Sequence, residues 1–82
     1  MNPELVKQAV AFAAEFSEQN NERIVVLING QNETTEVRPY LGHNFSYEQF
    51  LNALIINFSD GKKFIDIDSI NSIHFTNKNY RR

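Results

Sequence analysis

A short apolar segment, an Asn-Gly pair and a polar segment follow one another in this chain and restrict what it can fold into. Residues 24–28 are all apolar and mostly β-branched, and this run is too short for an independent helix. Such a run is typical of a strand that is covered on both faces. Asn29 and Gly30 both tolerate the positive φ of a type I′ turn, so we expect an antiparallel return strand over residues 31–37.

The returning segment is too polar for the centre of a sheet. It offers little to bury before Val37, and its charges are typical of an edge strand that avoids unwanted pairing. A two-residue turn would place Ile28 opposite Gln31, and Arg23 opposite Glu36 as a cross-strand ion pair. We therefore expect this segment to form the rim of a curled sheet.

The N-terminal segment carries the signals of a helix over residues 3–19. Asn2 is a suitable N-cap, and Pro3 is well placed at the first helical position. Apolar residues then recur at helical spacing, which predicts one buried face. The stripe consists of Leu5, Ala9, Phe12, Ala13 and Phe16, widened by Val6 and Val10.

The middle of the chain supports two interpretations. Ser46 and Gln49 have the spacing of a capping box, which predicts a short helix over residues 46–53 that leads into a strand over residues 54–58. The apolar residues of this segment also fit a single helix that continues to Phe58. Both interpretations stay open at this point.

The last third of the chain predicts strands joined by tight turns. Residues 62–68 alternate, with Ile65 and Ile67 on one face, and a turn at residues 69–71 precedes a strand over residues 72–76. The fold class is therefore α+β, with an N-terminal amphipathic helix packed on a small curled antiparallel sheet of about five strands. A second short helix near residues 46–53 is compatible with it.

Residues 1–76 are expected to form a single globular domain, and residues 77–82 a mobile basic tail. The 82 residues include no cysteine, and the sequence shows neither a signal-peptide pattern nor an apolar run of membrane-spanning length. We therefore expect a soluble cytoplasmic protein without a membrane partner. The motifs assign the chain to no family.

Reactive side chains do not converge in the sequence. Asp66 and Asp68 lie two apart on one strand face, with His74 as a third candidate for a metal or acid–base site, but a solvated strand face explains them better. His43 lies in a polar loop, no hydroxyl has a nucleophile-elbow context, and no glycine-rich phosphate loop occurs. We expect no enzyme activity, no cofactor and no metal.

Two classes of partner remain. An edge strand can accept a strand of another protein, or of a second copy, through its backbone. This predicts that the protein is an accessory factor, inhibitor or regulator. Its partner-binding residues would be Gln31, Asn32, Glu33, Thr34, Thr35 and Glu36. The alternative is a nucleic-acid-associated protein that uses Lys62, Lys63, Lys78, Tyr80, Arg81 and Arg82. Residues 1–61 have a charge balance of −5 and residues 62–82 one of +3, so only the C-terminal part suits a phosphate backbone.

Overall fold

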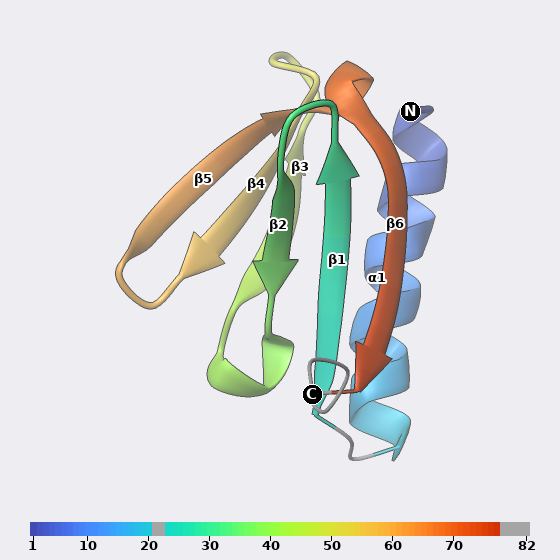
Figure 1. Cartoon of the computed structure of the whole chain (residues 1–82), viewed down its shortest axis with the longest axis vertical. Coiled ribbons are helices and arrows are strands. Elements are labelled where there is room, and N and C mark those ends of the chain that lie inside the picture. The colour runs from blue at the N-terminus through green and yellow to red at the C-terminus, as the bar shows by residue number, and fades with distance from the viewer. Residues whose placement is uncertain (21–22, 78–82) are drawn as a thin grey trace.

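A computed structural model describes residues 1–20 and 23–77 of the chain (Figure 1). It contains one α-helix, six strands and two single 3₁₀ turns. In chain order these are α1 (Pro3–Asn20), β1 (Ile24–Gly30), β2 (Thr34–Val37), η1 (Pro39–Leu41), β3 (Asn44–Glu48), β4 (Ala53–Phe58), β5 (Gly61–Asp66), η2 (Ile67–Ser69) and β6 (Ile70–Asn77). The α+β class is confirmed, but the strands form two antiparallel sheets of three, β2-β1-β6 and β3-β4-β5.

Helix α1 begins where its capping signal predicts. The Asn2 side-chain oxygen accepts hydrogen bonds from the backbone N–H groups of Glu4, at 2.7 Å, and Leu5, at 3.3 Å. These bonds satisfy donors that have no partner within the helix. Val6 and Ala13 are fully buried, whereas Phe12 is more than half exposed and packs its ring beside Phe75 of β6. The buried face is therefore narrower than the predicted apolar stripe.

The first sheet has β1 at its centre, and this strand is buried on both faces as predicted. Ile24, Val26 and Ile28 point into the core, while Val25 is buried on the opposite face. Strand β6 pairs with one edge of β1 and β2 with the other, so β2 is an edge strand (Figure 1). The prediction that the returning strand lies at the rim is confirmed.

The predicted register of the β1–β2 hairpin is wrong. Ile28 pairs with Thr35, not with Gln31, and Val26 pairs with Val37. The two loop residues are Gln31 and Asn32, because the Gly30 N–H donates to the Glu33 carbonyl oxygen at 2.8 Å. Within the described residues only Asn52 and Gly42 have positive φ, so no type I′ turn forms at Asn29-Gly30. The observed register buries Thr35 and Val37 against the middle of β1, and this burial outweighs the local turn preference.

The predicted ion pair between Arg23 and Glu36 does not form in this register. Leu27 is the residue opposite Glu36. The Glu36 carboxylate accepts a hydrogen bond from the side chain of Arg38, two residues further along the chain. The guanidinium of Arg23 instead lies 5.9 Å from the centroid of the Tyr40 ring. Both arginines therefore support the segment that follows β2.

The second sheet replaces the helix expected at residues 46–53. Ser46 pairs with Ile55 and Tyr47 with Leu54 as β3 and β4 run antiparallel, so the capping-box interpretation is wrong. The strand predicted at residues 54–58 is present as β4. Phe50, which the helical pattern would place on the buried face, is instead 97% exposed at the turn between β3 and β4.

Strand β5 ends earlier than expected. It stops at Asp66, whose carboxylate accepts from the Asp68 N–H at 3.2 Å and so caps η2. The 3₁₀ turn predicted over residues 69–71 occupies Ile67–Ser69, and β6 continues to Asn77. The predicted alternation holds, because Ile65 is half-buried and Ile67 fully buried, whereas Phe64 is exposed.

The core lies between α1, the first sheet and the second sheet. Buried side chains from all three meet there, and Leu54 and Ile56 represent the second sheet. The N-terminal ammonium group donates to the Ile67 carbonyl oxygen at 3.0 Å and ties the start of α1 to η2. No helix in residues 1–20 and 23–77 is long and apolar enough to cross a membrane.

Candidate functional site

Strand β2 presents its outer edge without a neighbouring strand in the part of the chain that the structure describes. In an antiparallel pair, hydrogen-bonded residue pairs alternate with non-hydrogen-bonded ones. The Gly30–Glu33 pair is hydrogen-bonded, so Thr35 also bonds to β1, and the N–H and C=O groups of Thr34 point outward. The edge thus offers a partner strand a backbone donor and acceptor at Thr34.

Beyond the end of β2, the backbone N–H groups are no longer available to a partner strand. The Arg38 N–H donates to Nδ1 of His43 at 3.0 Å, so this outward amide already has an acceptor. The His43 ring stands edge-on to Phe58, with 4.9 Å between the ring centroids, and this contact fixes its orientation. Pro39, at the start of η1, has no N–H to donate. A partner strand can therefore pair with β2 itself and with little beyond it.

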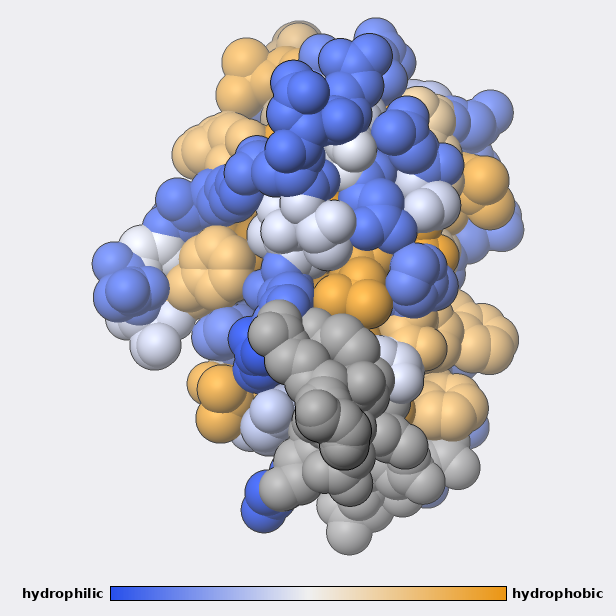
Figure 2. Space-filling model, viewed as in Figure 1, coloured by the Kyte–Doolittle hydropathy of each residue, from blue (hydrophilic) through white to orange (hydrophobic). Residues whose placement is uncertain are grey.

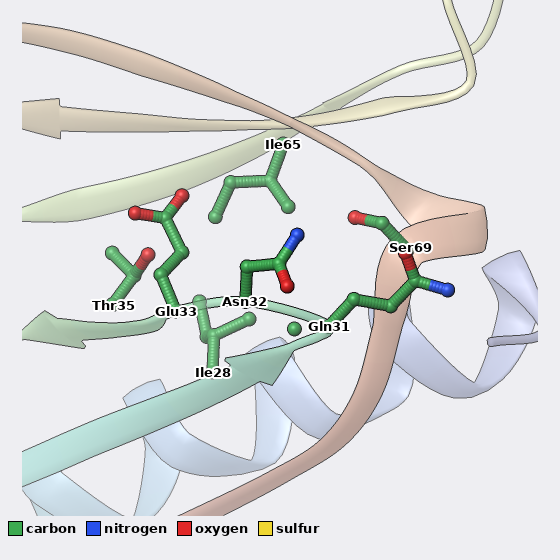
Figure 3. A pocket seen from close by; sticks show the side chains of 8 residues that line it. Ile28, Gln31, Asn32, Glu33, Thr35, Ile65 and Ser69 are labelled. Atoms are coloured by element: carbon green, nitrogen blue, oxygen red, sulfur yellow. The ribbon is translucent and has the colours of Figure 1, made fainter.

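A hollow of about 280 Å³ lies beside β2, between the β1–β2 turn and the end of β5 (Figure 3). Its walls come from four segments: β1, the turn with β2, β5 and η2. Ile65 points down from β5 toward Ile28 of β1, and the two side chains provide the apolar part (Figure 3). The lining residues are Ile28, Gly30, Gln31, Asn32, Glu33, Thr35, Ile65 and Ser69.

Thr35 places a hydroxyl group in this hollow. The residue is only 6% exposed, yet its side chain makes no hydrogen bond to another described residue. Among the described residues, no fully buried side-chain nitrogen or oxygen lacks a partner, so the Thr35 oxygen keeps some exposed surface, and Thr35 is one of the residues that line the hollow. A nearly buried hydroxyl without a protein partner is a ready donor or acceptor for a ligand.

The Glu33 carboxylate borders the same hollow and forms an ion pair with a lysine side chain. Its Oε2 lies 3.1 Å from Nζ of Lys63, which reaches across from β5. The Glu33 side chain is 65% exposed and the Lys63 side chain 33%, so the pair lies at the surface and is readily exchanged. Surface residues over the β1–β2 turn are hydrophilic, as Figure 2 shows.

The structure brings together four of the six residues predicted to bind a partner. Gln31, Asn32, Glu33 and Thr35 line the hollow. Thr34 lies on the other face of the strand, where its hydroxyl donates to the Asn29 side-chain oxygen at 2.8 Å. Glu36 also lies on that face and is paired with Arg38, so these two residues do not face the hollow.

Sequence reasoning missed the far wall of the hollow. Ile65 and Ser69 come from a segment about thirty positions away from β2, and nothing in the local pattern links them to it. The one available signal was the alternation of residues 62–68, which places Ile65 on the same face as the buried Ile67.

The residues of the nucleic-acid alternative are not gathered into one surface. Lys63 is engaged with Glu33, and Lys62 is exposed on the neighbouring position of β5. Lys78, Tyr80, Arg81 and Arg82 lie outside the described residues, as does all of the predicted tail except Asn77, which ends β6. Of the residues predicted to bind nucleic acid, the structure describes Lys62 and Lys63, and of these two only Lys62 has no ion pair with a described residue.

The predicted metal candidates are separated by the fold. Asp68 belongs to η2, not to the strand that carries Asp66, and His74 pairs with Leu27 in the other sheet. In the described ranges, no three His, Asp or Glu side chains are grouped closely enough to hold a metal ion. Comparison with known proteins adds no relative, since no protein-family model, curated protein or solved structure matches the chain.

Proposed function

We propose that this chain is a small non-enzymatic cytoplasmic protein that acts by contact with another protein, as an accessory factor, inhibitor or regulator. The contact is made by the outer edge of β2, to which a partner adds an extended strand. One observation carries this proposal: β2 ends its sheet with the Thr34 amide pointing outward, directly beside a hollow lined by polar groups. Backbone bonds along such an edge provide affinity, and the hollow provides selectivity.

Charge favours a protein partner over nucleic acid. Glu33 borders the hollow and Glu36 lies on the same strand, so a phosphate backbone at this edge would meet two carboxylates. Lys63, the basic residue that reaches this hollow from β5, is already paired with Glu33 and is therefore not available to a phosphate group. Nucleic-acid binding remains the alternative that the experiment distinguishes.

A proline at Thr34 tests the proposal directly, because it removes the outward N–H without breaking a bond to β1. Thr34→Val is the matched control, since it changes the same side chain and keeps the amide. The wild type and both variants are used as bait in lysate of the native host, with and without nuclease, after circular dichroism has shown that all three fold. Size-exclusion chromatography reports self-pairing as a change of mass.

We expect the wild type and Thr34→Val to retain the same protein, and Thr34→Pro to lose it, with nuclease having no effect. Equal retention by the folded Thr34→Pro variant would contradict pairing along β2. If nuclease releases everything that is bound, and about 0.3 M salt does so too, the nucleic-acid alternative is correct, because phosphate contacts weaken steeply with salt.

A further inference from the structure

A strand added to β2 would direct side chains into the hollow. Glu33 and Thr35 lie two apart, so their side chains share one face of the strand and line the same space. Neighbouring strands in a sheet place equivalent side chains on the same face, about 5 Å away. Every second side chain of the partner strand therefore lies on the side of the hollow.

The walls of the hollow suit a side chain that is apolar along its stem and charged at its tip. Ile28 and Ile65 supply aliphatic surface, while the Glu33 carboxylate and the Thr35 hydroxyl supply acceptors at the edge (Figure 3). Lysine and arginine have this build, since they bury the methylene stem and keep the charged head near water. A hollow of about 280 Å³ is below the usual range for drug-sized ligands, roughly 300–1,000 Å³, and matches a single long side chain better.

The protein already shows which charge the site accepts. Lys63 places its ammonium group 3.1 Å from the Glu33 carboxylate, at the border of the hollow. We propose that the strand that pairs with β2 carries a lysine or arginine whose head group replaces Lys63 at Glu33 and bonds to the Thr35 hydroxyl. This inference rests on the proposed edge pairing, and it adds the chemical class of the partner segment.

Long-range charge supports the same partner. Residues 1–61 hold eight acidic and three basic side chains, so the part of the chain around β2 attracts a basic segment. Thr35 supplies the second, independent observation, because its nearly buried hydroxyl opens into the hollow without a partner among the described residues. A purely aliphatic side chain would leave the Thr35 hydroxyl without a partner, and an acidic side chain would face the Glu33 carboxylate.

Synthetic strand peptides test the inference. The probes are acetylated and amidated heptapeptides of alternating threonine and valine whose central residue is lysine, norleucine or glutamate. Binding to the ¹⁵N-labelled protein is followed by chemical-shift changes of the backbone amides. We expect shifts at Glu33, Thr35 and Ile65, and about twofold tighter binding of the lysine peptide than of the norleucine peptide, at the low end for an exposed ion pair because the lysine must displace Lys63 from Glu33.

Four variants separate the two parts of the proposal. Glu33→Gln should remove the preference for lysine, and Lys63→Gln should strengthen binding of the lysine peptide because the internal competitor is gone. A change that merely disturbed the fold would weaken binding in both. Glu15→Gln, an equal change of charge on the exposed face of α1, should have no effect. Thr34→Pro should abolish binding of all three peptides.

The outcomes are distinct. Equal binding of the lysine and norleucine peptides, unchanged by Glu33→Gln, would overturn the basic partner and leave edge pairing intact. Binding that survives Thr34→Pro would overturn edge pairing. The absence of shifts at Glu33, Thr35 and Ile65 at millimolar peptide would overturn this inference whatever the variants do with cellular partners.

Discussion

Replacement of Thr35 by valine should stabilise the folded protein, because its nearly buried hydroxyl group makes no hydrogen bond to another described residue. Thr35 is 6% exposed and lies opposite Ile28, which is 1% exposed, so the side chain occupies an apolar environment. Its hydroxyl has no hydrogen-bond partner among the described residues. Valine has nearly the same shape and is also favoured in strands, so the main change is the loss of the hydroxyl group.

The magnitude follows from the cost of a buried polar group. A hydroxyl buried without a hydrogen bond costs about 1–3 kcal/mol in proteins, and the open hollow reduces this cost because water can enter it. We expect Thr35→Val to raise the free energy of unfolding by about 1 kcal/mol, the low end of that range. For a domain of this size, such a gain raises the Tm by about 4–8 °C.

Urea and thermal unfolding followed by circular dichroism measure the change. Thr34→Val, one position away, is the matched control: its hydroxyl donates to Asn29 at 2.8 Å, so this variant loses a hydrogen bond. We expect it to lower stability by about 0.5 kcal/mol. A loss of about 1 kcal/mol or more in Thr35→Val would refute the reasoning, because it would mean that the hydroxyl has a partner in the folded protein.

Four further changes test other parts of the structure. Ile56→Ala removes a fully buried side chain and should cost about 2–5 kcal/mol in chemical unfolding, whereas Phe50→Ala at the exposed β3–β4 turn should change stability by less than about 0.5 kcal/mol. Asn2→Ala removes the cap of α1 and should lower stability by about 0.5–2 kcal/mol, with a loss of helical ellipticity. A chain that ends at Asn77 should keep its fold and its protein partner, and loss of the partner would instead favour the nucleic-acid alternative.

The hairpin shows what local patterns predict and what they do not. The strand, the return and the edge position of β2 follow from the apolar run and the polar segment after it. The register does not, because the turn signal at Asn29-Gly30 would leave Val37 beyond the end of β1. Pairing Val37 with Val26 buries it centrally, and burial of this kind depends on the core, not on the turn.

The segment over residues 46–53 departs from the predicted helix for a related reason. Ser46 and Gln49 fit a capping box, and Phe50 continues a helical pattern, yet Phe50 is 97% exposed. A periodic pattern predicts a helix only if its apolar residues are the buried ones. Here β4 pairs with β3 and β5 on both sides, and these pairings decide the structure.

The candidate site was predictable only in part. Glu33 and Thr35 were named because they lie on a polar edge strand, which the sequence can show. Their joint position around a hollow required Ile65 and Lys63 from β5, which the fold brings to them from a distant part of the chain. The orientation of Thr34, with its amide outward, depends on the register and could not be read without it.

Hydrogen exchange of the backbone amides of β2 tests the open edge most directly. The Thr35 amide bonds to β1, whereas the Thr34 amide points away from it. We predict that Thr34 exchanges at close to the rate of an unstructured residue, while Thr35 and Val37 are protected as strongly as the core of β1. Protection of Thr34 equal to that of Thr35 in the isolated monomer would show that the edge is already covered, and would contradict binding of a partner strand there.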